Sequence, residues 1–229
     1  MGAHIKRLAA PKSWPIKRKI STFITKPNPG THCLERCVPL NVLLRDMLGY
    51  ARTTREVRKI LNLNTVLIDC IKRKNVRFPV GIMDTVSIKE INKYYRVTMN
   101  KKGKIITTEI DKSEAELKPC KIINKSIIKG KIQLNLFDGR NILTDSKDTY
   151  KTNDTVIIKL PEQEIKEHLR LEKNAKIFLI DGKHNGEIGT VTDIMGRKIK
   201  YRLSDDVTVE TTAKHVFVIG KDTPAVKVC

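Results

Sequence analysis

Apolar residues between positions 40 and 48 recur with the period of a helix. They place five side chains on one helical face: Leu40, Leu43, Leu44, Met47 and Leu48. Gly49 ends this stripe. From residue 94 to about residue 173 the pattern changes, because short apolar runs alternate with polar residues and with turn sequences. The folded part of the chain is therefore predicted to begin with helix and to continue mainly as β-strands.

A second short helix is predicted after Gly49. Thr53 stands three residues before Glu56, the spacing of a capping box, and an apolar stripe with Val57 and Leu61 follows. The opposite face of this helix carries Arg52, Arg55, Arg58 and Lys59. Short strand signals between residues 66 and 88 then surround a basic loop with Lys72, Arg73, Lys74 and Arg77. A basic helix beside a basic loop can follow two stretches of phosphate, although either run alone is more typical of a solvated face.

Two turn sequences stand out in the β part. Asp138 and Gly139 lie between the runs 133–136 and 141–143, which predicts a β-hairpin with Asp138 as a turn residue. Later, glycines at positions 182, 186 and 189 separate a strand, a tight turn and a second strand, and apolar runs at 207–209 and 216–218 complete a small barrel. Glycine permits close backbone approach, so a ligand strand could lie against the turn formed by Lys183, His184 and Asn185. A plain hairpin is the alternative.

The charge of the chain points to a partner. It holds 45 Lys and Arg against 25 Asp and Glu, a net charge of +20, and the first 34 residues hold seven Lys and Arg and no acidic residue. Such an excess destabilises the compact state unless phosphate neutralises it, which favours nucleic acid. A membrane is not expected, because no uncharged stretch approaches the roughly 18 residues of a spanning helix. The basic, Pro-rich arm is predicted to lack structure when free and to become ordered on RNA.

Together these elements predict a multi-domain α+β protein that is mostly β. We expect a basic N-terminal arm and linker at 1–34, a small α+β RNA-binding domain at 35–95, a central β-barrel-like domain at 96–172 and a second small barrel at 173–229. The central domain has 16 basic and 12 acidic residues, a balance that favours a scaffold role.

Motifs for chemistry are sparse. The five cysteines are odd in number and irregularly spaced, as expected in a reducing cytosol. His32, Cys33 and Cys37 have the spacing of half a zinc site, but no second half-site follows, so no metal is expected. There is no P-loop, zinc-protease helix or dinucleotide-binding glycine pattern. We therefore predict no enzyme activity and no cofactor.

Several stretches, in order along nearly the whole chain, resemble one known family. They are residues 4–15, 45–48, 55–61, 78–84 and 130–141. They are similar to the small-subunit ribosomal protein number four of the archaeal and eukaryotic type. Residues 182–191 resemble a KOW motif, a β-hairpin element of ribosomal and transcription-elongation proteins. The resemblance implies that the last domain is a KOW/SH3-like small barrel.

The resemblance also implies a function. The chain would be a structural constituent of the small ribosomal subunit in the cytoplasm, present in one copy per ribosome. It would bind small-subunit rRNA near its 5′ region, beside neighbouring ribosomal proteins, and so support translation. Aromatic residues are only 5% of the chain, so phosphate and shape contacts are expected to dominate over base reading.

The candidate RNA-binding residues come from the arm, the second helix, the basic loop and the KOW-like turn. They are Lys6, Arg7, Lys12, Trp14, Lys17, Arg18, Lys19, Arg45, Arg52, Arg55, Arg58, Lys59, Lys72, Arg73, Lys74, Arg77, Lys183, His184 and Asn185. For Trp14 two roles are equally expected, because its ring could stack on a base or pack against the body of the protein.

Two other functions stay open at this point. A free regulatory RNA-binding factor of KOW type would need residues 176–219 but not the basic arm. An RNA-modification enzyme, such as a pseudouridine synthase, or an accessory protein of one, could share the two-helix unit. The enzyme would also need an aspartate in a large α/β catalytic domain, whereas after Ile88 this chain offers β-hairpins in small units.

Overall fold

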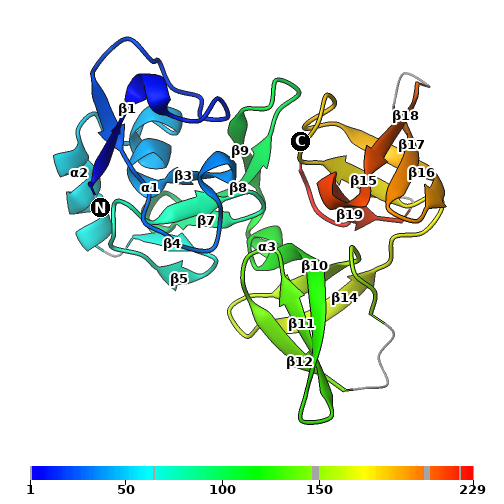
Figure 1. Ribbon diagram of the computed structural model, residues 1–229. Coiled ribbons are helices and arrows are strands. Elements are labelled where there is room, and N and C mark those ends of the chain that lie inside the picture. Colours follow the sequence, from blue (N-terminus) through cyan, green and yellow to red (C-terminus); the bar gives the residue numbers. More distant parts are fainter. Residues whose placement is uncertain (1, 64, 146–149, 204–206, 222, 229) are drawn as a thin grey trace. The chain divides into compact units, whose positions relative to one another are not determined.

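The computed structural model describes residues 2–63, 65–145, 150–203, 207–221 and 223–228. The chain divides into two compact units, Met1–Glu116 and Leu117–Cys229, each built mainly from β-strands (Figure 1). Each unit buries its own hydrophobic clusters. The prediction of a mostly β, multi-domain fold is confirmed.

A five-stranded antiparallel sheet forms the centre of the first unit, in the order β5-β4-β7-β8-β9. The strands are β4 (Val66–Ile68), β5 (Ile71–Lys72), β7 (Thr85–Ile88), β8 (Lys93–Met99) and β9 (Ile105–Ile110). Smaller elements surround the sheet: the pair β3 (Cys37–Pro39) and β6 (Pro79–Gly81), α3 (Lys112–Ala115), and the 3-10 turns Leu34–Arg36 and Lys89–Ile91. The predicted domain boundary between residues 95 and 96 falls inside β8, which pairs with β7 on one side and β9 on the other.

The predicted first helix forms in two pieces. α1 (Leu40–Val42) continues directly as a π-helical turn, Leu43–Met47, and the backbone then leaves the helix at Gly49, whose φ of 70° suits glycine. Leu40, Leu43 and Leu44 are completely buried. The apolar stripe of the sequence thus packs into the core of the first unit.

The second predicted helix is α2 (Thr54–Asn62), and its capping box is present. The Thr53 hydroxyl accepts a hydrogen bond from the Glu56 amide at 3.3 Å, and the Glu56 carboxylate accepts one from the Arg52 amide at 2.8 Å. These contacts satisfy amide donors that the first helical turn leaves open. Val57 and Leu61 are completely buried in the same core as α1.

The basic arm is folded, contrary to the expectation that it lacks structure. Strand β1 (His4–Lys6) pairs with β2 (Phe23–Thr25), and a 3-10 turn, Arg7–Ala9, follows β1. Ala10, Trp14 and Ile24 belong to the core cluster of the first unit. The physical reason is that the arm's few apolar residues bury against α1 and the central sheet, so its charge alone did not decide its state.

The second unit contains two five-stranded antiparallel sheets. The first has the order β12-β11-β10-β13-β14 and the second the order β18-β17-β16-β15-β19. The strands of the first are β10 (Leu117–Ile128), β11 (Lys131–Leu136), β12 (Asn141–Thr144), β13 (Thr155–Lys159) and β14 (Glu164–Leu169). Those of the second are β15 (Lys176–Leu179), β16 (Ile188–Met195), β17 (Lys198–Leu203), β18 (Thr208–Thr212) and β19 (Val216–Gly220), with a 3-10 turn Ala213–His215 before β19.

The predicted hairpin around Gly139 is the β11–β12 pair, and Gly139 has a φ of 77°. Asp138 does more than turn the chain. The residue is 2% exposed, and its carboxylate lies 3.1 Å from the Lys118 ammonium and 2.9 Å from the Arg140 guanidinium. The turn is therefore held against β10 by a buried ion pair with Lys118. The sequence pattern around Asp138 did not predict this contact, because Lys118 is distant in the chain.

A second buried lysine joins the two sheets of this unit. Lys121, on β10, is 3% exposed, and its ammonium donates to the carbonyl oxygens of Ala213, Lys214 and Val216 at 2.5, 3.2 and 2.8 Å. A buried ammonium is tolerated only when hydrogen bonds replace its hydration. Lys121 therefore fixes the start of β19 against the first sheet.

Candidate nucleic-acid interface

Helix α2 presents a basic face to solvent. Arg55, Arg58 and Lys59 of α2 are exposed, on the side opposite the buried Val57 and Leu61, and Arg52, just before the helix, is exposed as well. Within the described part of the chain, the side chains of Arg55, Arg58 and Lys59 form no ion pair. The nearby Glu56 carboxylate is held by the cap, and its hydrogen bond from the Arg52 amide lowers its pKa below 4.5. The predicted helical face is available to bind an anion.

The basic loop after β5 divides into two kinds of residue. Lys72 and Lys74 are exposed. The Arg73 guanidinium instead lies 4.5 Å from the centre of the Phe78 ring, a cation–π contact. Arg77 reaches the arm, because its Nε donates to the Lys26 carbonyl at 3.1 Å. The loop thus offers two exposed lysines, while its arginines help to hold it in place.

The arm divides in the same way. Four of its cations are exposed: Lys6, Lys12, Lys17 and Lys19. Arg18 is directed inward, and its guanidinium donates to the carbonyl oxygens of Ala10 and Pro11 at 2.9 and 2.8 Å. These carbonyls directly follow the 3-10 turn Arg7–Ala9, so Arg18 holds the chain where it leaves that turn. These hydrogen bonds occupy the Arg18 guanidinium within the arm, and an RNA contact of Arg18 stays a prediction.

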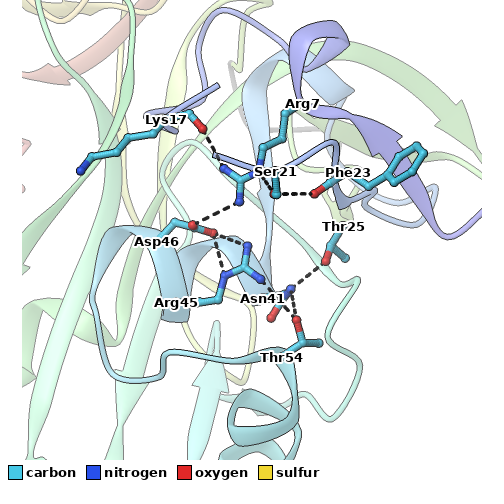
Figure 2. A network of polar contacts seen from close by, with 9 residues as sticks. All are labelled: Arg7, Lys17, Ser21, Phe23, Thr25, Asn41, Arg45, Asp46 and Thr54. Carbon is cyan, nitrogen blue, oxygen red and sulfur yellow. Dashed lines mark hydrogen bonds and ion pairs between the residues drawn. The ribbon is translucent and has the colours of Figure 1, made fainter. Parts of the chain in front are cut away.

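Arg7 also serves the fold, as Figure 2 shows. It is 6% exposed, and it donates to the Ser21 hydroxyl at 2.8 Å and to the Lys17 carbonyl at 2.9 Å. Its guanidinium also lies 3.8 Å from a carboxylate oxygen of Asp46. Arg7 therefore closes the arm's loop and ties it to the end of the first helix, so the structure does not support a direct RNA contact for it.

Arg45 continues this network from the helix side (Figure 2). It donates to the other Asp46 oxygen at 2.8 Å and to the Thr54 hydroxyl at the start of α2 at 3.3 Å. The Asn41 amide joins Thr54 to the Thr25 hydroxyl of β2, at 3.2 and 2.7 Å. The arm, the first helix and the start of α2 are thus held in one network, which fixes the exposed cations of the arm relative to those of α2.

The structure resolves the two roles proposed for Trp14. Its side chain is 1% exposed, in the core of the first unit, and its indole N–H points to the Leu34 carbonyl at 3.4 Å. Its ring is therefore covered and not available to stack on a base. The exposed aromatic ring of the arm belongs to Phe23, which the sequence reasoning passed over.

The predicted KOW-like turn lies between β15 and β16 in the second unit. Lys183 is exposed, and His184 contacts the Glu187 carboxylate through Nδ1 at 3.1 Å. Asn185 is half-buried. Gly182 has a φ of 99°, and a side chain there would meet nothing within 4 Å, so the turn needs glycine for its backbone conformation rather than for space.

The half zinc site of the sequence has other contacts. His32 lies 3.1 Å from the Asp84 carboxylate, and both side chains are buried. Burial raises the pKa of the Cys37 thiol to about 12. Across the described residues, nowhere do three or more His, Cys, Asp or Glu side chains gather in a way that could hold a metal ion. In the same residues, none of the helices has the length and hydrophobicity that crossing a membrane requires.

Ten of the predicted RNA-binding cations therefore lie exposed on the first unit, and we call these ten the exposed cations. They are Lys6, Lys12, Lys17, Lys19, Arg52, Arg55, Arg58, Lys59, Lys72 and Lys74. They lie on an ordered scaffold of strands and a capped helix. The fold and these residues define the class of multi-domain, mostly β proteins with a strongly cationic surface, suited to a polyanion.

Comparison with known proteins gives the particular family. Residues 91–165 match the family described as Ribosomal family S4e, and residues 2–35 match the RS4NT (NUC023) domain. The chain is 43% identical to small ribosomal subunit protein eS4 of Methanocella arvoryzae, over 99% of this chain and 97% of that protein. It is also 43% identical to the eS4 protein of Methanosphaera stadtmanae, over 97% of this chain and 94% of that protein. The chain belongs to the ribosomal S4e family.

A solved structure agrees with this assignment. The crystal structure of the 30S ribosomal protein S4e from Thermoplasma acidophilum is similar to this fold with a TM-score of 0.70 and 29% sequence identity. The similarity covers 81% of this chain and 96% of that one. The likeness therefore extends beyond a single domain.

Proposed function

We propose that the chain is a structural constituent of the small ribosomal subunit that binds and stabilises small-subunit rRNA. The relatives named above are small-subunit ribosomal proteins, and they align with nearly the whole chain. One copy would be present per ribosome, in the cytoplasm, beside neighbouring small-subunit proteins. The role is one of binding rather than of catalysis.

The observation that carries this proposal is the set of exposed cations. A cation that already has a carboxylate partner gains less from phosphate, whereas Arg55, Arg58 and Lys59 form no such pair within the described residues. Arg side chains can also bind phosphate through two parallel hydrogen bonds. Binding by these residues would release counterions, so it should weaken steeply as salt is added.

The protein would recognise the phosphate backbone and the shape of the RNA. The arm is folded by the network of Arg7, Arg45 and Asp46, so its exposed lysines are already positioned before RNA arrives. A positioned surface loses less conformational entropy on binding than a disordered arm would. This replaces the mechanism in which the arm becomes ordered only on RNA.

The second unit would contribute through its last domain. Residues 182–191 form the turn and the strand start that resemble a KOW motif, and exposed Lys183 lies in that turn. We assign this turn a single phosphate contact, secondary to the exposed cations of the first unit.

Sucrose-gradient fractionation of a cell lysate at low and high salt, with immunoblotting for this chain, tests the proposal. Co-migration with the small subunit at low salt, with a smaller bound fraction at high salt, is the expected result, because phosphate contacts weaken as salt is added. A signal confined to unbound fractions at both salt concentrations would reject a ribosomal role.

A further inference from the structure

One face of the β1–β2 ribbon in the arm points away from the core. The register pairs Ile5 with Ile24 and Lys6 with Phe23. Ile24 is 3% exposed and Ile5 is partly buried against the core. Because side chains alternate along a strand, Lys6 and Phe23 lie together on the opposite, outer face.

Phe23 is unusual among the aromatic residues of this protein. Of the Phe, Tyr and Trp side chains, all of which lie in the described ranges, only Phe23 and Tyr50 are exposed, at 51% and 37%. The Tyr50 hydroxyl is held by the Tyr95 hydroxyl at 2.5 Å. The Phe23 ring instead points away from the polar network of the arm, as Figure 2 shows.

The exposed ring has an aromatic neighbour that supports it. The His4 ring meets the Phe23 ring edge to face, with centroids 4.6 Å apart and planes at 66°. Such an arrangement stabilises the pair and leaves ring surface open. A partner that adds a flat, apolar surface would therefore find a positioned platform.

The backbone beneath the platform is fixed. The Arg7 amide donates to the Thr22 carbonyl at 2.9 Å, and the Lys26 amide donates to the Ala3 carbonyl at 3.1 Å. The Phe23 carbonyl accepts a hydrogen bond from the Ser21 hydroxyl at 3.3 Å, and that hydroxyl is itself bound by Arg7. These bonds lie on both sides of Phe23, so its position does not depend on a ligand.

We propose that His4 and Phe23 form a stacking site for an unpaired nucleobase of RNA, with Lys6 beside it for the phosphate of the same nucleotide. Unpaired bases are commonly bound by aromatic side chains, and a stacked base needs only an open ring and a nearby cation. The seven positive and no negative side chains among the first 34 residues favour RNA over an apolar protein surface. The proposal rests on the proposed function and adds a base contact to it.

The test uses the full chain and two RNA hairpins that share one stem. One hairpin has a single bulged nucleotide, 4-thiouridine, and the other is fully paired. We expect the wild-type chain to prefer the bulged hairpin by about tenfold, and Phe23→Leu to abolish the preference while leaving affinity for the paired hairpin unchanged. Irradiation should cross-link the thiouridine to the peptide that contains Phe23. Ile20→Ala is the matched control, because Ile20 is 69% exposed in the same arm but has no ring.

The outcomes separate this inference from the proposed function. If wild type and Phe23→Leu bind both hairpins equally and the cross-link maps elsewhere, the stacking site is rejected while the phosphate interface stands. If the wild-type chain binds neither hairpin, the proposed function itself fails. If Phe23→Leu reduces only co-migration with ribosomal subunits and not hairpin binding, the ring belongs to a protein contact and the stacking site is again rejected.

Discussion

The two units of the chain differ in charge. The first unit, Met1–Glu116, has 24 Lys and Arg and 10 Asp and Glu, a net charge of +14. The second unit, Leu117–Cys229, has 21 Lys and Arg and 15 Asp and Glu, a net charge of +6. The second unit pairs many of its surface cations with carboxylates: Lys131 with Asp145, Lys159 with Glu162, Arg170 with Glu172, Lys173 with Asp193 and Lys200 with Glu210. It also buries two lysines, Lys118 and Lys121, at 1% and 3% exposure.

The difference teaches that basic residues have two distinct uses in one chain. In the second unit, buried ammonium groups bind carbonyl or carboxylate oxygens and hold strands together. In the first unit, arginines such as Arg7 and Arg18 hold the arm, and the exposed cations are left for a polyanion. Net charge alone does not separate these uses, but substitutions should.

The largest expected effect tests whether a buried lysine stabilises the second unit. Lys121→Met leaves three carbonyl oxygens without their ammonium donor, so we expect the free energy of unfolding of the second unit to fall by about 3 kcal/mol or more. Urea denaturation followed by circular dichroism measures this. Lys166→Met, at an exposed position of the same unit, should change it by less than about 0.5 kcal/mol. Equal stability of the two variants would contradict a structural role for Lys121.

The next effect tests whether the exposed cations of α2 bind RNA. Reversing Arg55 and Lys59 together to Glu should weaken RNA binding by about 100-fold at 0.1 M salt, roughly tenfold for each lost phosphate contact. Reversing Lys166 and Lys198 to Glu changes the net charge equally, and both are exposed in the second unit. We expect that control to weaken binding by less than about tenfold. Similar losses in filter-binding titrations would indicate a diffuse charge effect and no defined interface.

A smaller effect separates two neighbours in the arm. Lys19→Ala should reduce the slope of log affinity against log salt by up to about one, and leave stability unchanged. Arg18→Ala should do the reverse, lowering the melting temperature with little change in slope, because its guanidinium binds carbonyl oxygens. Parallel salt titrations and thermal melts measure both quantities. A flattened slope for Arg18→Ala at unchanged stability would restore Arg18 to the RNA contacts.

The smallest effect compares one carboxylate from each unit. The pKa of Glu56 lies below 4.5 because of backbone and Thr53 hydrogen bonds, and the pKa of Asp193 lies below 3.8 because of Lys173. Each contributes stability that is fully present above its ordinary pKa and is lost as the pH falls through the lowered pKa. In NMR titrations, 1 M salt should return Asp193 toward 3.8 and leave Glu56 lowered, because salt screens an exposed ion pair more than a helix cap. An equal response of both groups would show that charge, not capping, lowers the pKa of Glu56.

The local signals of the sequence predicted much of this fold. The spacing of Thr53 and Glu56 predicted the start of α2, and Asp138 with Gly139 predicted the β11–β12 hairpin, because both depend on residues close in the chain. The family was indicated separately, by the resemblance of several stretches along the chain to a known family. The exposure of Arg55 and Arg58 followed from their helical spacing opposite Val57 and Leu61.

Contacts between distant residues were beyond such reasoning. Arg7 contacts Asp46, Arg77 contacts the Lys26 carbonyl and Lys121 contacts β19, and each of these decides whether a cation points inward. The burial of Trp14 and the exposure of Phe23 could not be predicted for the same reason, since the pairing of β1 with β2 and the packing of the arm decide which ring is covered. The exposed residues of a charged segment can therefore be identified only when its tertiary contacts are known.

The burial of Trp14 gives the protein a built-in optical probe. It is the single tryptophan of the chain, and it lies inside the core that the arm completes. Its emission should be blue-shifted while the arm is packed and should move to longer wavelength if the arm detaches, because indole emission follows the polarity around the ring. The state of the arm during purification, salt stripping or assembly can thus be followed in unlabelled protein, with no substitution at all.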